Sequence, residues 1–207
     1  MVEIMGIIGL SFFAYLLGSI PFGYYIARAK GVEDIRKIGS GSTGGTNVGR
    51  TLGKGYGLLV AFLDGLKCLF PTFLALKVFG IDWIISLVIL LVVLGHIFSI
   101  WLKFRGGKGV ASAIGGLILI VPPLFLLVEA IVWLACFLIK RYVSLANLVM
   151  LFFIPLILWL TYHSWIYLLF GVVLFAIIAW AHRDNIVRII QGTERRIRFP
   201  DFLDFSY

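Results

Sequence analysis

The chain has 207 residues, of which 61% are hydrophobic and only 14% are charged, and its mean hydropathy is +1.07. A soluble domain of this size buries too little of its surface to hide so many apolar side chains, so the composition excludes that class and predicts a membrane protein. The net charge of +8 comes from Lys and Arg placed between apolar runs, which is typical of topology signals and not of a nucleic-acid-binding face. Cys68 and Cys136 lie inside apolar runs, so neither a disulfide nor a redox pair is expected.

Apolar runs of membrane-crossing length recur along the whole chain, and a crossing helix needs roughly 20 such residues. The stretch 106–139 is too long for one helix and contains Val121-Pro122-Pro123, where proline removes an amide donor, so we expect two helices there. The sequence therefore predicts an all-α, polytopic integral membrane protein with a single domain over residues 1–207. The seven expected spans are Ile4–Ala27, Gly55–Phe79, Trp83–Leu102, Gly107–Val121, Pro123–Ile139, Val143–Tyr162 and Trp165–Ala181.

The positions of Lys and Arg test this count. With seven spans, the loops on one side of the membrane and the tail carry 16 of the 18 Lys and Arg residues. The loops on the other side carry none, and only Lys67 and Lys77 remain, both in the second run. Because positive residues mark the cytoplasmic side, we expect the N-terminus outside and the C-terminus inside.

The first polar stretch, residues 34–50, is richer than a connector needs to be. Its Gly, Ser and Thr residues favour a loop whose backbone amides point inward as a nest for an anion. Arg36, Asn47 and Arg50 add donors that a flexible Gly/Ser linker would not need. The alternative is a plain connector, and the residue types favour an anion site over it.

A second polar stretch carries Gly106-Gly107-Lys108-Gly109 at the start of the fourth expected span. A helix N-terminus with free amides and a lysine is a natural phosphate site, although the spacing is not that of a Walker A loop. The alternative is a helix cap combined with positive residues that set topology. His96, at the cytoplasmic end of the third span, is interpreted as a packing or interfacial residue.

A third stretch begins at the end of the last span. His182 and Asn185 are three residues apart, so they share one face if the helix continues. The alternative is a basic tail that contacts acidic lipid headgroups. That alternative accounts for Arg195, Arg196 and Arg198, but not for His182 with Asn185.

Asp64, Lys67 and Glu129 lie inside the expected spans, where a charge is costly and usually paired or functional. Asp64 and Lys67 are three residues apart, and we expect them either to pair or to brace the site. Glu129, in the fifth span, has no interpretation from the sequence.

At these residues the chain resembles the bacterial acyl-phosphate:glycerol-3-phosphate acyltransferases, the membrane-integral, PlsY-type family. Three motifs occur in the order, spacing and chain length of the family, so the resemblance covers nearly the whole chain. Residues of this chain depart from the usual pattern at Ser42, where the family has Asn, at Gly45, where it has Ala, and at Ser99, where it has Pro. The matching residues are Asp34-Ile35-Arg36, Gly39-Ser40-Gly41, Thr46-Asn47 and Arg50; Gly95-His96 and Phe104 with Gly106–Ala111; and His182-Arg183, Asn185-Ile186, Arg188, Gly192 and Glu194.

The resemblance implies an enzyme of phospholipid biosynthesis in the cell inner membrane, with its active site on the cytoplasmic face. Its substrates would be acyl phosphate and glycerol 3-phosphate, beside membrane lipid, with no cofactor, metal or nucleic acid. The general base stays open between His182 and a substrate phosphate oxygen. The resemblance assigns catalytic roles to His182, Asn185 and Ser40; phosphate binding to Arg50, Lys108, Gly41, Thr46, Asn47, Gly106, Gly107 and Gly109; and structural support to Glu194 and His96.

The main alternative function is a membrane anion transporter or lipid flippase. Transporter sites usually lie near the bilayer midplane at broken helices and internal repeats. Here the polar stretches fall on one expected face and no repeat is evident. Other lipid enzymes are disfavoured, because the His-x-x-x-x-Asp signature and acidic metal-binding clusters are missing, and a non-catalytic scaffold leaves the glycine-rich cationic stretches unexplained.

Overall fold

The computed structural model describes residues 2–197, and every regular element in that range is a helix. Arg198, which the sequence assigns to the basic tail, lies outside the described residues. The chain divides into two compact units, Met1–Leu119 and Ile120–Tyr207, which are called here the N-terminal unit and the C-terminal unit. The all-α prediction is confirmed for the described part of the chain.

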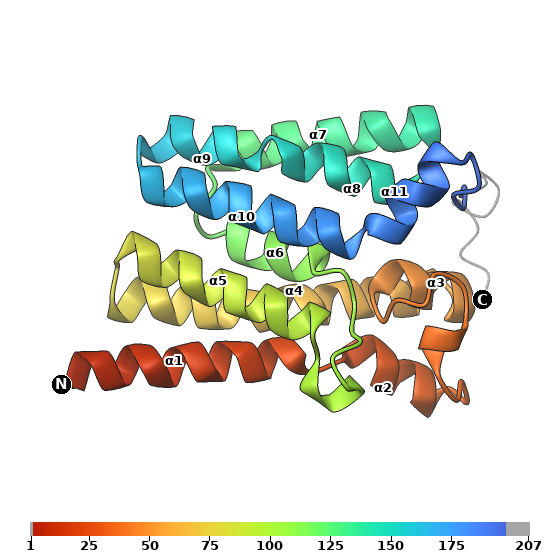
Figure 1. The fold of residues 1–207 in the computed structure, drawn as a ribbon, viewed down its shortest axis with the longest axis horizontal. Helices are drawn as coiled ribbons and strands as arrows, with labels where there is room; N and C mark the ends of the chain where they lie inside the picture. Colours follow the sequence, from red (N-terminus) through yellow and green to blue (C-terminus); the bar gives the residue numbers. More distant parts are fainter. Residues whose placement is uncertain (1, 198–207) are drawn as a thin grey trace. The chain divides into compact units, whose positions relative to one another are not determined.

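The N-terminal unit is built from long apolar helices joined by glycine-rich loops (Figure 1). Pro21 lacks an amide donor, and the first apolar run is accordingly broken between α1 and α2 at residues 20–21. Lys103 and Phe104, after η2, both take left-handed conformations, with φ of 55° and 61°. The elements are α1 (Val2–Ser19), α2 (Phe22–Ala29), η1 (Ile35–Lys37), α3 (Gly45–Leu52), α4 (Lys54–Val78), α5 (Asp82–Ile97), η2 (Ile100–Leu102) and α6 (Val110–Leu117).

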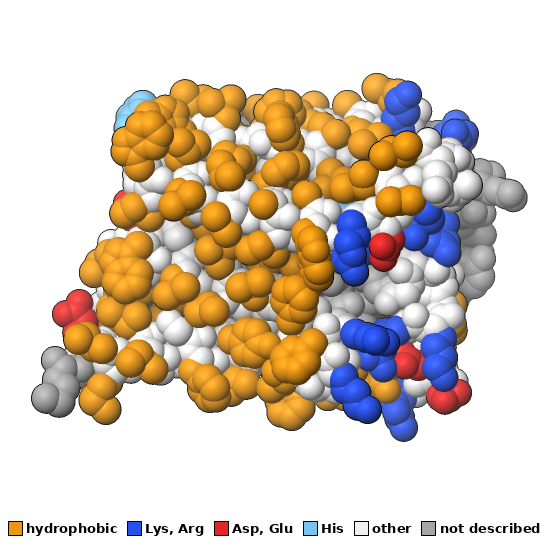
Figure 2. All heavy atoms as spheres, in the orientation of Figure 1, with side chains coloured by type: hydrophobic (Ala, Val, Ile, Leu, Met, Phe, Trp, Pro, Cys, Tyr) orange, Lys and Arg blue, Asp and Glu red, His pale blue; other side chains and the backbone are white. Residues whose placement is uncertain are grey.

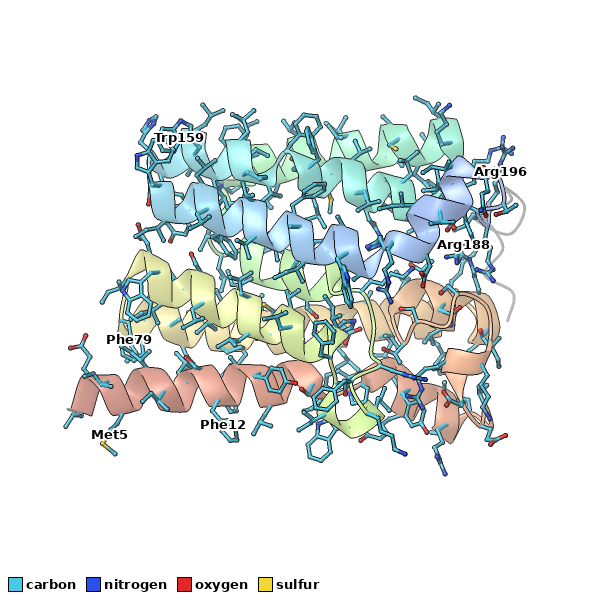
Figure 3. All side chains as sticks on the ribbon, in the orientation of Figure 1. Met5, Phe12, Phe79, Trp159, Arg188 and Arg196 are labelled. Atoms are coloured by element: carbon cyan, nitrogen blue, oxygen red, sulfur yellow. The ribbon has the colours of Figure 1, made fainter. Side chains whose placement is uncertain are left out.

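Glycines set the helix contacts of the N-terminal unit. α1 packs along α5, and a Cβ added at Gly95 would overlap the carbonyl oxygen of Tyr15. α4 packs against α3 and α6, and a Cβ at Gly57 would lie 2.7 Å from the Gly49 Cα. Close backbone approach through small residues is how membrane helices associate, because water cannot drive apolar faces together there. In Figure 3, Met5 and Phe12 point away from this unit, whereas Phe79 lies against α1 at Gly6.

The C-terminal unit contains α7 (Pro123–Lys140), α8 (Val143–Phe152), α9 (Ile154–Tyr162), α10 (Trp165–Ala181) and α11 (Arg183–Ile190). α7 packs on α8, and α9 packs on α10, where a Cβ at Gly171 would lie 2.7 Å from the Pro155 Cα. Pro155, near the start of α9, lies at the break that divides the sixth apolar run. α11 is bent away from α10 by 65° at His182.

Helices of membrane-crossing length agree closely with most of the expected spans. Among residues 2–197, five helices are long and apolar enough, Val2–Ala29, Lys54–Val78, Asp82–Leu102, Pro123–Lys140 and Val143–Tyr162, or up to six if the bent pair α10 and α11 is one span. The expected fourth span is reduced to α6, whose eight residues rise only ~12 Å. The chain is therefore a multi-pass membrane protein, and the count of seven spans and the orientation of the termini stay predictions.

The surface is mostly apolar along the helices that are expected to contact lipid (Figure 2). In the N-terminal unit, hydrophobic side chains cover the long helices, and Lys and Arg gather at the end far from the N-terminus. In the C-terminal unit, Lys and Arg gather near α11. Large apolar side chains are exposed on every long helix, among them Phe62 on α4 and Leu127 on α7, as expected of helices that face lipid.

Candidate functional site

The first polar stretch begins with an ion pair between Asp34 and Arg36. The Asp34 carboxylate caps η1 by accepting the Arg36 backbone amide at 2.9 Å and forms an ion pair with the Arg36 guanidinium at 2.8 Å. These hydrogen bonds hold the pKa of Asp34 below its usual value. The same guanidinium donates to the Leu102 carbonyl at 3.0 Å, which ties this stretch to the loop before the second motif.

Asn47 organises the loop between η1 and α3. Its side chain is 1% exposed, and its carbonyl oxygen accepts the Ser40 amide at 2.8 Å. Its amide nitrogen donates to the carbonyl oxygens of Ile35, Ile38 and Ser42, at 3.2, 3.0 and 2.9 Å. Both Asn47 amide protons therefore stay within the loop, so the geometry favours a role in shaping the loop over the predicted direct contact with phosphate.

Two further features define the first-motif loop. Gly39 and Gly41 both have positive φ, 60° and 72°, which L side chains rarely adopt, so glycine is required at these turns. Ser42, which replaces the usual Asn, accepts the Gly44 amide at 3.2 Å through its hydroxyl oxygen. This hydrogen bond keeps the chain turned just before α3 starts.

α3 presents donors to solvent from one face. Thr46, near its start, and Arg50, one turn later, are both exposed and lie on the same side of the helix. Ser40 lies half-buried in the preceding loop. The structure thus places these three predicted site residues within one short segment, and Asn47 fixes its shape.

The second motif is a turn that lies against the end of α5. Gly106 and Gly107 donate their amides to the carbonyl oxygens of Ile97 and His96, at 2.9 and 3.0 Å. A Cβ at either glycine would overlap His96, at its carbonyl oxygen for Gly106 and at its ring for Gly107, so the close approach requires glycine at both positions. Gly109 has φ of 84° and starts α6, with Lys108 half-buried beside it.

Two tethers join the second-motif region to the end of α1. The Ser99 hydroxyl donates to the Ser19 carbonyl at 2.6 Å, and the Tyr15 hydroxyl donates to the Phe98 carbonyl at 2.8 Å. Serine at position 99 therefore supplies a hydrogen bond that the usual proline cannot make. Together with the Arg36–Leu102 contact, these bonds bring the first and second motifs into one framework within the N-terminal unit.

A buried ionic cluster lies beside this framework. Asp64 and Lys67 form an ion pair, at 2.8 Å between the carboxylate and the ammonium, and both are nearly inaccessible to solvent. His96 joins them, with Nδ1 2.8 Å from the Lys67 Nζ. Pairing of Asp64 with Lys67 was one of the two alternatives that their spacing left open, whereas the addition of His96, 29 residues along the chain, was not predicted.

The third motif lies in the C-terminal unit and depends on Glu194. This carboxylate accepts hydrogen bonds from the Asn185 amide at 2.7 Å, the Arg188 guanidinium at 2.8 Å and the Ser144 hydroxyl at 3.0 Å. Burial alone would raise the pKa of Glu194, but the three donors outweigh it and hold the pKa below its usual value. Arg188, which is labelled in Figure 3, lies on α11 with Asn185.

His182 lies at the bend between α10 and α11. Its Nδ1 is 2.8 Å from the Ile178 carbonyl oxygen, a group that only accepts, so Nδ1 carries the proton and donates. The prediction that His182 and Asn185 share one face required a helix that continues through this residue, whereas α11 is bent from α10 by 65°. His182 and Asn185 are both buried. Glu129 is also buried, at 4% exposure in α7, and nothing in the structure explains it.

Known proteins resemble this chain over nearly its whole length. The family model for glycerol-3-phosphate acyltransferase matches residues 8–192. The glycerol-3-phosphate acyltransferase of Aquifex aeolicus is 48% identical over 89% of this chain and 95% of that protein, and the one of Rhodopseudomonas palustris is 46% identical over 88% and 92%. The crystal structure of PlsY (YgiH), an integral membrane glycerol 3-phosphate acyltransferase in its glycerol 3-phosphate form, has a TM-score of 0.89 and 45% identity, covering 96% of this chain and 98% of that chain. The lysophosphatidic acid form of PlsY has a TM-score of 0.87 and 44% identity.

Proposed function

The chain belongs to the glycerol-3-phosphate acyltransferase family and is an integral membrane acyltransferase, and we propose that it transfers an acyl group from acyl phosphate to the sn-1 hydroxyl of glycerol 3-phosphate. Family membership decides against the alternative of an anion transporter or lipid flippase. The products would be 1-acyl-glycerol 3-phosphate and inorganic phosphate, made at the cytoplasmic face of the inner membrane. The observation that carries the proposal is the glycine-rich, cationic framework of the first two motifs in the N-terminal unit, which suits phosphate groups.

The chemistry requires little activation of the acyl donor. An acyl phosphate is a mixed anhydride with a good leaving group. The glycerol 3-phosphate hydroxyl oxygen attacks the carbonyl carbon, a new ester bond forms, and the bond between that carbon and the phosphate oxygen breaks. The proton of the hydroxyl passes to a phosphate oxygen, so that inorganic phosphate leaves. Catalysis then rests mainly on positioning and on donors that stabilise the developing charge.

The N-terminal unit supplies the groups that would hold phosphate. Ser40, Thr46 and Arg50 lie together around the start and exposed face of α3. Lys108 and the turn formed by Gly106, Gly107 and Gly109 lead into α6. Guanidinium, ammonium and backbone amide donors form short, charge-assisted hydrogen bonds with phosphate oxygens. Asn47 acts in this proposal by holding the first-motif loop, together with the turns at Gly39 and Gly41.

The C-terminal unit supplies the groups that would orient glycerol 3-phosphate. His182 donates through Nδ1 to a backbone carbonyl, so Nε2 of the neutral ring is an acceptor for a hydroxyl. The Asn185 amide donates to Glu194, which supports a structural role for Glu194, and in this proposal Asn185 contacts the substrate. We propose that all three motifs serve one reaction.

The donor assay tests this function. The purified protein in lipid is given labelled glycerol 3-phosphate and, separately, acyl phosphate, acyl-CoA or acyl carrier protein thioester. We expect labelled 1-acyl-glycerol 3-phosphate and an equal amount of inorganic phosphate from acyl phosphate alone. Product from a thioester donor, without phosphate release, would overturn the assignment of the donor.

The role of His182 is tested by His182→Gln, which keeps a polar group at the ring position. If a substrate phosphate oxygen accepts the proton, this variant retains much of its kcat while its KM for glycerol 3-phosphate rises. A loss of kcat of roughly 1,000-fold or more would instead identify His182 as the general base. The variant's thermal unfolding is measured alongside, so that misfolding is separated from loss of chemistry.

A further inference from the structure

The buried cluster of Asp64, Lys67 and His96 takes no part in the chemistry described so far. These side chains come from α4 and the end of α5, and the residues are 1%, 3% and 6% exposed. Taking charges out of water is costly, and a buried ion pair is often no more stabilising than apolar residues of the same size. A contribution to stability therefore does not account for this cluster, and its geometry must be considered.

Distances within the cluster fix the protonation of the His96 ring. The Lys67 ammonium is a donor only, and it lies 2.8 Å from His96 Nδ1. A proton on Nδ1 would clash with it, so Nδ1 accepts and the ring hydrogen lies on Nε2. The Asp64 carboxylate is farther from Nδ1, at 3.4 Å, and 2.8 Å from the Lys67 Nζ. Asp64 thus balances the charge of Lys67, which in turn holds the imidazole in one tautomer and one orientation.

The cluster also joins the end of α1 to the second motif. Lys67 donates to the Ile20 carbonyl at 2.9 Å, at the break between α1 and α2. His96 accepts the Gly107 amide through its backbone carbonyl, at 3.0 Å. The Nε2 side of its ring fills the space where a Gly107 Cβ would lie. The Lys67 ammonium therefore fixes the His96 ring at Nδ1. The Nε2 edge of that ring packs against Gly107, next to Lys108 in the chain.

We propose that Lys67 is a positioning residue, which acts through His96 to hold the Gly106–Gly109 turn in the shape that receives a substrate phosphate. Asp64 makes this arrangement possible by compensating the buried charge. The inference rests on the proposed function, because it takes this turn as a phosphate site. The inference gives Lys67 and Asp64 a role in substrate binding in addition to their internal ion pair.

A set of charge-matched variants separates positioning from stability. Asp64→Asn and Lys67→Met each leave one buried charge without its partner, whereas the double variant Asp64→Asn/Lys67→Met removes both charges together. Lys77→Met is the matched control, since Lys77 lies at the far end of the same helix, with its ammonium over the Phe73 ring. Thermal unfolding, kcat and the KM for each of the two phosphate substrates are measured in one lipid mixture.

The expected result is that stability and kinetics respond differently. The single variants unfold at lower temperature, and the double variant recovers most of that loss, because no lone charge remains buried. The KM for at least one phosphate substrate stays raised about 10- to 100-fold in both Lys67→Met and the double variant, because the turn is no longer held in place. A double variant that recovers its KM along with its stability would show that the cluster is structural only.

The ring tautomer gives a second test, which is read on the wild-type protein. In the wild-type protein labelled with ¹⁵N-histidine, we expect one buried ring to show an unprotonated Nδ1 and a protonated Nε2, assigned to His96 by its loss in His96→Asn. A protonated Nδ1 in that ring would overturn the proposal. His182 serves as an internal contrast, since its Nδ1 donates to Ile178.

Failure of this inference and failure of the proposed function give distinct results. If the donor is not acyl phosphate, the donor assay shows this with wild-type protein, and the KM comparison is then made with the donor that works. If Lys108→Met changes neither KM, the turn is not a phosphate site and the premise itself is wrong. If Lys108→Met raises a KM whereas Lys67→Met does not, only the positioning role is refuted.

Discussion

Glu194 determines how the third motif is held. Its two carboxylate oxygens receive three side-chain donors, from Asn185, Arg188 and Ser144, and these come from α11 and from α8. Charge-assisted hydrogen bonds of this kind are stronger than neutral ones, and a buried donor that loses its partner carries the full cost of desolvation. The residue therefore fixes where Asn185 points, although it lies in an irregular segment after α11.

We expect Glu194→Gln to lower both stability and activity. The amide retains one acceptor oxygen but places a donor against the Arg188 guanidinium, at a cost of about 2 kcal/mol. Because Asn185 loses its position, kcat/KM should fall about 10- to 100-fold. Asp184→Asn, on the exposed side of the same helix, is the control and should leave both unchanged. Thermal unfolding and the acyl-transfer assay measure the two effects, and an unaltered kcat/KM would contradict this role.

The lowered pKa of Glu194 sets the pH range in which it stabilises the fold. Its folded-state pKa lies below the usual 4.5, so its contribution is complete above about pH 4.5 and is lost as the pH falls through the lower folded-state value. The difference in melting temperature between wild type and Glu194→Gln should hold from neutral pH down to about 4.5 and narrow below it. If the difference in melting temperature begins to narrow more than about one pH unit above 4.5, the hydrogen-bond donors do not outweigh the effect of burial on the pKa of Glu194.

At the scale of elements, contact between α3 and α4 is what presents the first motif. Gly45, Gly49 and Gly57 lie where the two helices touch, and a Cβ on Gly57 would come within 2.8 Å of the Gly45 carbonyl oxygen. The backbones approach so closely that no side chain fits between them. The glycines therefore serve helix packing here, and Thr46 and Arg50 lie on a different, exposed face of α3.

Gly57→Ala should separate α3 from α4. Alanine normally stabilises a helix relative to glycine by about 0.5–1 kcal/mol, but overpacking at this contact costs about 1–3 kcal/mol, so the net effect is destabilising. Gly55→Ala is the matched control on the same helix, because a Cβ there meets nothing within 4 Å. A lower melting temperature for Gly57→Ala alone, with a raised KM for a phosphate substrate, is the expected result. Equal behaviour of the two variants would contradict the packing role.

At the scale of the whole molecule, hydropathy and charge define which surfaces meet lipid. Apolar side chains are exposed along the long helices, whereas Lys and Arg lie in loops and near helix ends, apart from the buried Lys67 of α4. α6 is the exception to simple spanning, since its eight residues cover ~12 Å of a ~30 Å hydrocarbon core. Crossing at residues 107–121 would thus need the glycine turn and the residues after Leu117 as well as α6 itself.

Topology can be measured with reporter fusions. If the chain crosses seven times with its N-terminus outside, a phosphatase fused after Gly80 or His163 is active outside the membrane. A fluorescent protein fused after Lys54, Arg105 or Arg141 should mature inside. The informative position is Arg141, because an active phosphatase there would mean that residues 107–139 do not cross twice, which would also put Lys140 and Arg141 against the positive-inside rule.

The sequence by itself determined the class of protein, the residues at which most of the apolar helices begin and end, and the three motifs. Run length and hydropathy are local properties, so the ends of the sixth apolar run, Val143 and Tyr162, match the structure. Glycine and charge in a short segment likewise predict an anion-binding loop without knowledge of its surroundings. Hence the interpretations of Lys108 and Arg50 as phosphate groups follow from composition and the resemblance, and remain predictions to be tested.

Only the tertiary structure decided which polar groups are partners. Ser144 meets Glu194 across 50 residues, and Lys67 meets His96 across 29, because helix packing brings them together, and no local pattern encodes that meeting. The structure likewise shows that the Asn47 amide is committed to its own loop and that the chain bends at His182. A side chain's role depends on which atoms surround it once water is excluded, and those atoms are set by the fold.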